Sequence, residues 1–97
     1  MTTYVVAPAA KADIDEIALY IAAADRAAAE RFIDEIYDAF DLLALQPGLG
    51  HYRRDLTDRP VRFWTVMRRY MIVYRDRSPV EIVRVLSGYR DIAALLA

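Results

Sequence analysis

The second half of the chain carries two runs of apolar, β-branched and aromatic residues, at 70–75 and at 81–86. A serine-proline pair lies between these runs and Gly88 follows the second, so the pattern predicts a β-hairpin. A third run, at 61–67, predicts a further strand that joins the hairpin through a tight turn. Three consecutive strands with short connections favour an antiparallel meander.

The first half of the chain repeats apolar residues at helical spacing. Ile14, Ile17 and Ile21 stand at i, i+3 and i+7, on one helical face, and predict a helix over residues 9–23. A second apolar stripe predicts another helix, over residues 26–45. Its members are Ala29, Phe32, Ile36, Phe40 and Leu43.

Two interpretations of these helical segments fit the pattern. Their stripes are offset by only about 50°, so one helix of roughly forty residues fits nearly as well as two. Two helices that form a hairpin are favoured, because helices in globular proteins average about 11–12 residues. Asp25 is a suitable N-cap for the second of them.

The remaining segments complete a fold prediction. Residues 4–6, before Pro8, predict an N-terminal strand, and the polar stretch 51–60 predicts a loop. Residues 91–96 predict a short helix that must dock on the sheet or on a partner. The order predicts an α+β fold with an N-terminal strand, a helical hairpin, a three-stranded antiparallel meander and a short C-terminal helix. A length of 97 residues indicates a single domain over residues 1–97.

Both faces of the predicted sheet carry apolar residues. In the central strand Tyr70, Ile72 and Tyr74 face one way, whereas Met71, Val73 and Arg75 face the other. The helical hairpin can bury one of these faces. We expect the other face, which also carries arginines, to be left uncovered by the chain and to serve as a binding surface for another polypeptide.

Composition narrows the class of protein. Hydrophobic residues make up 57% of the sequence and charged residues 28%, which excludes a disordered chain. Either a partner covers some of these apolar residues or they form an ordinary alanine-rich core. The lack of cysteine excludes disulfides and thiol chemistry. No stretch reaches the roughly 20 apolar residues that span a bilayer, so we expect a cytoplasmic protein without membrane contact.

The net charge of −1 conceals an asymmetry. Residues 1–50 contain 3 basic and 9 acidic side chains (−6), whereas residues 51–97 contain 10 arginines and 5 acids (+5). The basic half either meets an anionic partner or forms ion pairs with the acidic helices of the same chain. Strand arginines with Trp64, Tyr74 and Tyr89 could build a nucleic-acid surface. The sequence pI of about 5.7 argues against direct nucleic-acid binding.

Residues that could carry catalysis are sparse. His51 is the only histidine, and the sequence has no Gly-rich phosphate loop, nucleophile elbow or paired-histidine motif. Four acids have the spacing of a solvated helix face: Asp34, Glu35, Asp38 and Asp41. We therefore expect no catalytic residue, no metal site and no cofactor.

An ordered set of short motifs spans nearly the whole chain. These are Pro8-Ala9-Ala10, Asp13-Ile14, Glu16-Ile17, Tyr20-Ile21-Ala22, Ala29-Glu30-Arg31-Phe32-Ile33, Leu45 with Pro47-Gly48, Arg69-Tyr70, Ile72-Val73-Tyr74-Arg75, Val83-Arg84-Val85-Leu86, and Gly88 with Arg90, Asp91 and Ile92. No single motif is specific. Their order, together with the order of elements, resembles the RelE/ParE superfamily of small bacterial toxins, and its ParE branch in particular.

This resemblance implies the toxin of a type II toxin–antitoxin module. A cognate antitoxin would hold the toxin inactive by wrapping it with a helix and an extended, acidic segment. ParE-like toxins are associated with inhibition of DNA gyrase by binding, whereas RelE-like relatives are ribosome-dependent mRNA endonucleases. The arginine in the Tyr-Arg-Leu-Val-Tyr run of the ribonucleases is replaced here by Met71, whose thioether cannot donate to a phosphoryl oxygen. Gyrase is therefore the favoured target.

The same resemblance suggests which residues contact partners. We expect the partner-binding residues to be Arg69, Arg75, Arg84, Tyr89 and Arg90. In the alternative, a metal-independent endoribonuclease, four of them would act on RNA: Arg69, Arg84, Tyr89 and Arg90. A third possibility is a member that has lost its toxicity and only pairs with its antitoxin. Ser87 stands where many ParE-like sequences carry histidine.

Overall fold

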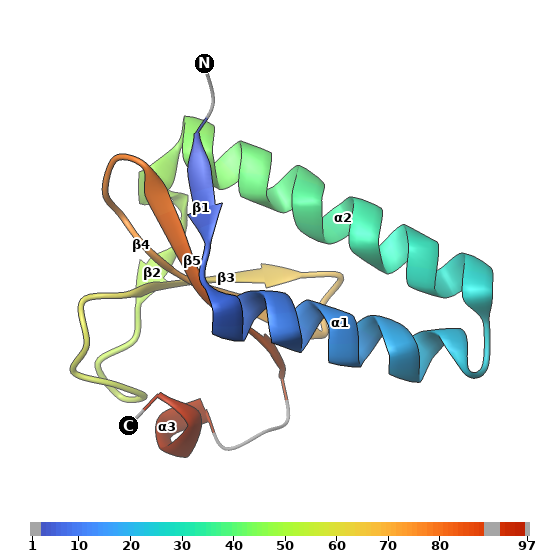
Figure 1. Ribbon diagram of the computed structural model, residues 1–97. Coiled ribbons are helices and arrows are strands. Elements are labelled where there is room, and N and C mark those ends of the chain that lie inside the picture. The colour runs from blue at the N-terminus through green and yellow to red at the C-terminus, as the bar shows by residue number, and fades with distance from the viewer. Residues whose placement is uncertain (1–2, 89–91, 97) are drawn as a thin grey trace.

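The computed structural model describes residues 3–88 and 92–96, with only the backbone of residue 93. In chain order the elements are β1 (Tyr4–Val6), α1 (Pro8–Ala22), α2 (Arg26–Leu45), the 3-10 helix η1 (Pro47–Leu49), β2 (His51–Tyr52), β3 (Arg62–Val66), β4 (Tyr70–Arg75), β5 (Val80–Ser87) and α3 (Ile92–Leu95). The described strands form a five-stranded sheet in the order β1-β5-β4-β3-β2 (Figure 1).

The sheet is mixed. β1 and β5 are parallel, with Tyr4 opposite Val80, and the other pairings in the described part are antiparallel. The order of a strand, two helices and a meander confirms the predicted α+β fold. The predicted loop at 51–60 begins with β2, in which His51 is paired with Phe63 of β3. A strand of two residues is too short to leave a periodic signal in the sequence.

The helices α1 and α2 form the predicted hairpin and run side by side in Figure 1. Asp25 is the N-cap of α2, and its Oδ1 accepts a hydrogen bond from the Ala28 amide at 3.1 Å. The cap satisfies one of the amides that a helix start leaves unpaired. No helix within residues 3–88 and 92–96 is long and apolar enough to cross a bilayer.

The helical hairpin covers one face of the sheet. Phe32, Ile36 and Phe40 of α2 are fully buried there against Ile72 and Tyr74 of β4. Burying each large apolar side chain of this kind contributes about 1.5–3 kcal/mol. This cluster contains the residues that the sequence placed on one parity of the central strand, so that assignment is confirmed.

The expectation of an open second face is wrong. Its central residue, Val73, is fully buried in a second cluster that includes Phe63 and Leu86 and is closed by Ile92 and Leu96. The chain therefore covers this face with its own C-terminal segment, which lies across the sheet from α1 and α2 (Figure 1). Apolar residues on both parities of the strands therefore serve two internal clusters.

A β-bulge in β5 distributes its side chains between these clusters. Val73 is paired with Arg84 and Tyr74 with Ile82, so Val83 is the extra residue. Ile82 packs in the first cluster, whereas Val83 contacts the second.

Candidate interaction surface

Arg84 lies at an edge of the sheet, because β1 covers only residues 80–82 of β5. Its Nε donates to Oδ2 of Asp13 at 2.7 Å and its Nη2 donates to Oδ1 at 2.9 Å. Nη1 lies 3.4 Å from the carbonyl oxygen of Leu95. The hydrogen bond to Asp13 raises the pKa of Arg84. This arginine therefore joins α1, the sheet and α3 within one molecule.

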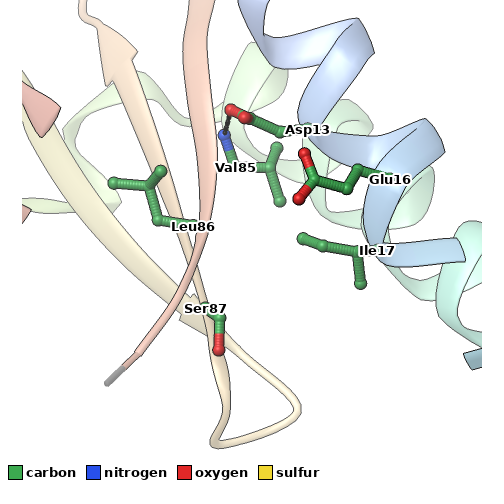
Figure 2. A pocket seen from close by; sticks show the side chains of 6 residues that line it. All are labelled: Asp13, Glu16, Ile17, Val85, Leu86 and Ser87. Atoms are coloured by element: carbon green, nitrogen blue, oxygen red, sulfur yellow. Dashed lines mark hydrogen bonds between the residues drawn. The ribbon is translucent and has the colours of Figure 1, made fainter. Parts of the chain in front are cut away.

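Asp13 also satisfies a backbone amide at the edge of β5 that β1 does not cover. Its Oδ2 accepts a hydrogen bond from the Val85 amide at 3.0 Å (Figure 2). A cavity of about 40 Å³ lies beside this contact. Its lining residues are Asp13, Glu16, Ile17, Val85, Leu86 and Ser87 (Figure 2). The cavity can hold water but is far smaller than the roughly 300 Å³ of a typical ligand pocket.

Arg75 is also engaged within the chain. Its Nε lies 3.4 Å from Oε1 of Glu81, which Arg77 approaches at 3.1 Å. The Arg75 Nε and Glu81 Oε1 atoms are buried and make no hydrogen bond within the described residues. The contact is therefore a charge interaction across neighbouring strands.

Two of the aromatic residues considered for nucleic acid lie on the helix-covered side of the sheet. Tyr74 is fully buried, and its hydroxyl donates to the Pro47 carbonyl at 2.6 Å and accepts from the Gly50 amide at 2.8 Å. Burial raises the pKa of Tyr74. Trp64 is half-buried against the same cluster. The Tyr74 ring therefore offers no open face of the kind that stacks on a base.

Arg69 differs from the other strand arginines. It is exposed in the turn between β3 and β4, and its side chain makes no hydrogen bond or ion pair within the described residues. Its carbonyl accepts a hydrogen bond from the Gly88 amide at 2.7 Å, so this turn lies beside the end of β5. Tyr89 and Arg90, the last two predicted partner-binding residues, lie outside the described residues.

The residues considered for catalysis and metal binding do not form a cluster in the described part of the chain. His51 is exposed in β2, and the acids at 34, 35, 38 and 41 are exposed along α2, as the sequence predicts for a solvated face. Within residues 3–88 and 92–96 no group of three or more histidines and acids is arranged to hold a metal ion.

Sequence reasoning missed two features of this surface. Asp13 lies in the acidic half of the chain and Arg84 in the basic half, so their ion pair is one of those expected between the two halves. The charge asymmetry alone does not specify which acid pairs with which arginine. The sequence predicts a tight turn after residues 61–67, but not the left-handed backbone of Met67 and Arg68, because no glycine or asparagine marks it.

Comparisons with known proteins agree with the fold and the motifs. A family model described as the ParE toxin of the type II toxin–antitoxin system, parDE, matches residues 4–92. The chain therefore belongs to the ParE family of toxins. A solved structure titled as the chromosomal ParDE toxin–antitoxin system from P. aeruginosa has the same fold. It matches with a TM-score of 0.70 and 22% identity, over 90% of this chain and 96% of that chain. No curated protein matches.

Membership in this family defines the class of function. The protein is the toxin component of a type II toxin–antitoxin system, and its natural partner is a cognate antitoxin.

Proposed function

We propose that this toxin inhibits DNA gyrase by binding to it rather than by chemistry of its own. The observation that carries the proposal is the residue at position 71. The ribonuclease branch of the superfamily resembled by this sequence uses an arginine there, to face the phosphate of RNA.

Met71 cannot replace that arginine. Its thioether offers no donor for a phosphoryl oxygen, so it cannot stabilise charge that develops there. The side chain is half-buried and packs against the second cluster, to which Leu96 belongs. Its local role is packing, which is compatible with a toxin that acts by binding.

Arg84 supports the same proposal. A catalytic arginine would need free N–H groups, but Nε and Nη2 of Arg84 bind Asp13, and Nη1 lies near the Leu95 carbonyl. Among the residues that an endoribonuclease would use, Arg69 alone is both described and without an internal side-chain partner in the described part of the chain.

We extend the proposal to the five partner-binding residues. Arg69 would contact a partner directly, whereas Arg75 and Arg84 would support the surface through their internal pairs. Charge reversal at Arg90 is expected to weaken the antitoxin complex by a few kcal/mol if this residue meets an acid of the partner. Charge reversal at Arg84 would also break the pair with Asp13, so it needs a stability measurement beside it.

A supercoiling assay tests the gyrase proposal. Purified toxin, added in the micromolar range to gyrase, ATP and relaxed plasmid, should block supercoiling, and an equimolar amount of the antitoxin should restore it. Full supercoiling in the presence of folded, antitoxin-free toxin would contradict the proposal. Primer extension on translated messages gives the matched comparison, because cleavage in the ribosomal A site would favour the endonuclease instead.

A further inference from the structure

An open groove of about 490 Å³, the interhelical groove, lies between α1 and α2. Its lining residues are Asp15, Ala18, Leu19, Ala22, Arg26, Ala29, Glu30 and Ile33, and none of them belongs to a strand. On each helix they occupy positions i, i+3, i+4 and i+7, which form one helical face. Each helix therefore presents a second stripe of residues, besides the stripe that it packs on the sheet.

The apolar part of this groove is open to solvent. Leu19 of α1 is 73% exposed and Ile33 of α2 is 37% exposed. Ala29 is buried between the helices, and its short side chain leaves the groove unfilled. Large apolar residues on the surface of a monomer are usually scattered singly, whereas here two of them line the same groove. The groove can therefore accept an apolar side chain from a partner.

The charged residues of the groove are of both signs. Asp15 already binds Lys11 at 2.7 Å. Arg26 and Glu30 are exposed, and in the described part of the chain neither makes a side-chain hydrogen bond or an ion pair. They stand four positions apart on α2, but an arginine that precedes the acid is the weaker order for a pair at this spacing. The groove thus retains one positive and one negative charge without a partner in the described chain.

We propose that the interhelical groove is the contact surface of a symmetric dimer, with a second copy of this chain as its occupant. Leu19 of each copy packs in the groove of the other, over Ala22 and Ala29. Arg26 of each copy pairs with Glu30 of the other, so the ion pair is formed twice. The four helices then form a bundle, in which stripes at this spacing become buried.

Charge complementarity selects a second copy as the occupant. A segment with charges of one sign, acidic or basic, would pair with one of Arg26 and Glu30 and repel the other. A nucleic acid would be repelled by the acidic half of the chain and would leave Leu19 exposed. A second copy presents one charge of each sign and an exposed leucine, in the reciprocal arrangement that a two-fold axis requires. This inference concerns self-association and does not depend on gyrase as the target.

Analytical ultracentrifugation of the antitoxin-free toxin tests the dimer. The mass should rise from 11.1 kDa toward twice that value as the toxin concentration is raised from the micromolar to the millimolar range. Leu19→Gln should weaken the dimer by about tenfold or more, because it removes the apolar contact but keeps the helix propensity. Leu45→Gln is the matched control, because Leu45 is 68% exposed on α2 but does not line the groove. A wild type that stays at 11.1 kDa, or equal effects of the two substitutions, would overturn the proposal.

Charge exchange tests the reciprocal contact. Arg26→Glu and Glu30→Arg each place like charges opposite one another twice, so each variant alone should dimerise more weakly by about tenfold or more. An equimolar mixture of the two variants should recover the wild-type affinity, because both positions of the mixed dimer then face an opposite charge. A mixture that remains monomeric would overturn the proposal.

The antitoxin is the competing occupant of the groove. The substitution Leu19→Gln should leave the Kd of the antitoxin unchanged within about twofold, as measured by titration calorimetry. It should also leave the urea denaturation of the monomer unchanged, because the leucine is exposed. A loss of antitoxin affinity as large as the loss of dimerisation would assign the groove to the antitoxin and overturn the proposal.

Discussion

The guanidinium of Arg84 and the carboxylate of Asp13 meet through two parallel hydrogen bonds, across 71 positions of sequence. Each comes from a half of the chain with opposite net charge. The same carboxylate accepts the Val85 amide, so it closes the edge of β5 where β1 has ended. Paired arginine–carboxylate contacts of this kind are shorter and stronger than neutral hydrogen bonds. The pair holds the helical hairpin against the sheet.

Removal of Arg84 should therefore destabilise the protein. We expect Arg84→Gln to lower the free energy of unfolding by about 1.5–3 kcal/mol, because it leaves the half-buried carboxylate of Asp13 without its charged donors. Urea denaturation measures this change. Lys11→Gln is the control, because the pair of Lys11 with Asp15 is exposed and its loss should not be measurable. Similar losses in both variants would contradict a structural role for Arg84.

The hydroxyl of Tyr74 should contribute through its two hydrogen bonds. Tyr74→Phe leaves the Pro47 carbonyl and the Gly50 amide without this partner. We expect a loss of about 1–3 kcal/mol in the free energy of unfolding, the typical cost of an unsatisfied buried group. A loss near zero would show that water replaces the hydroxyl at no cost.

The same residue predicts a dependence on alkaline pH. Burial raises the pKa of Tyr74 above its ordinary value of 10.0, so the folded state favours the neutral hydroxyl. That contribution to stability is fully present below about pH 10 and is lost as the pH rises through the raised pKa. As the pH rises above about 10 the wild type should therefore lose more stability than Tyr74→Phe. Parallel pH profiles would contradict this assignment.

Two glycines separated by two positions should respond differently to alanine. A Cβ at Gly50 would lie 2.6 Å from the Tyr74 hydroxyl and 2.9 Å from the Phe63 carbonyl oxygen, whereas a Cβ at Gly48 meets nothing within 4 Å. We expect Gly50→Ala to cost about 1–3 kcal/mol through overpacking. Gly48→Ala should be neutral or slightly stabilising. Thermal melting of the two variants distinguishes these outcomes.

The C-terminal segment should be required for stability, because it closes the second cluster. Leu96 is 1% exposed there, so Leu96→Ala should cost about 2–5 kcal/mol and increase binding of an apolar dye. Leu45→Ala provides the control, because Leu45 is 68% exposed at the end of α2 and should change stability by less than about 0.5 kcal/mol. A small effect at Leu96 would show that the segment contributes little to the fold.

The sequence predicts the elements of this fold well because their signals are local. The apolar stripe of α2, the N-cap at Asp25 and the serine-proline turn before β5 each depend on neighbouring residues. The parity of the central strand also follows from side-chain alternation, and it placed Tyr74 and Val73 on opposite faces correctly.

Contacts between residues far apart in the sequence could not be predicted in the same way. An apolar second face can be covered by a partner or by the chain itself, and the sequence pattern is the same in both cases. Only the packing of Ile92 and Leu96 on Val73 decides between them. Similarly, Arg84 could be recognised as a costly charge in an apolar strand, but its partner Asp13 is fixed by the docking of α1 on the edge of β5.

The pairing of β1 with β5 has a consequence for how the toxin is made. Tyr4 emerges first from the ribosome, yet its partner Val80 is synthesised when most of the chain is complete. The first strand must therefore wait, unpaired, while both helices and three other strands are produced. A nascent or prematurely terminated chain that lacks β5 cannot complete the sheet, so the toxin can fold fully only when its translation is nearly complete.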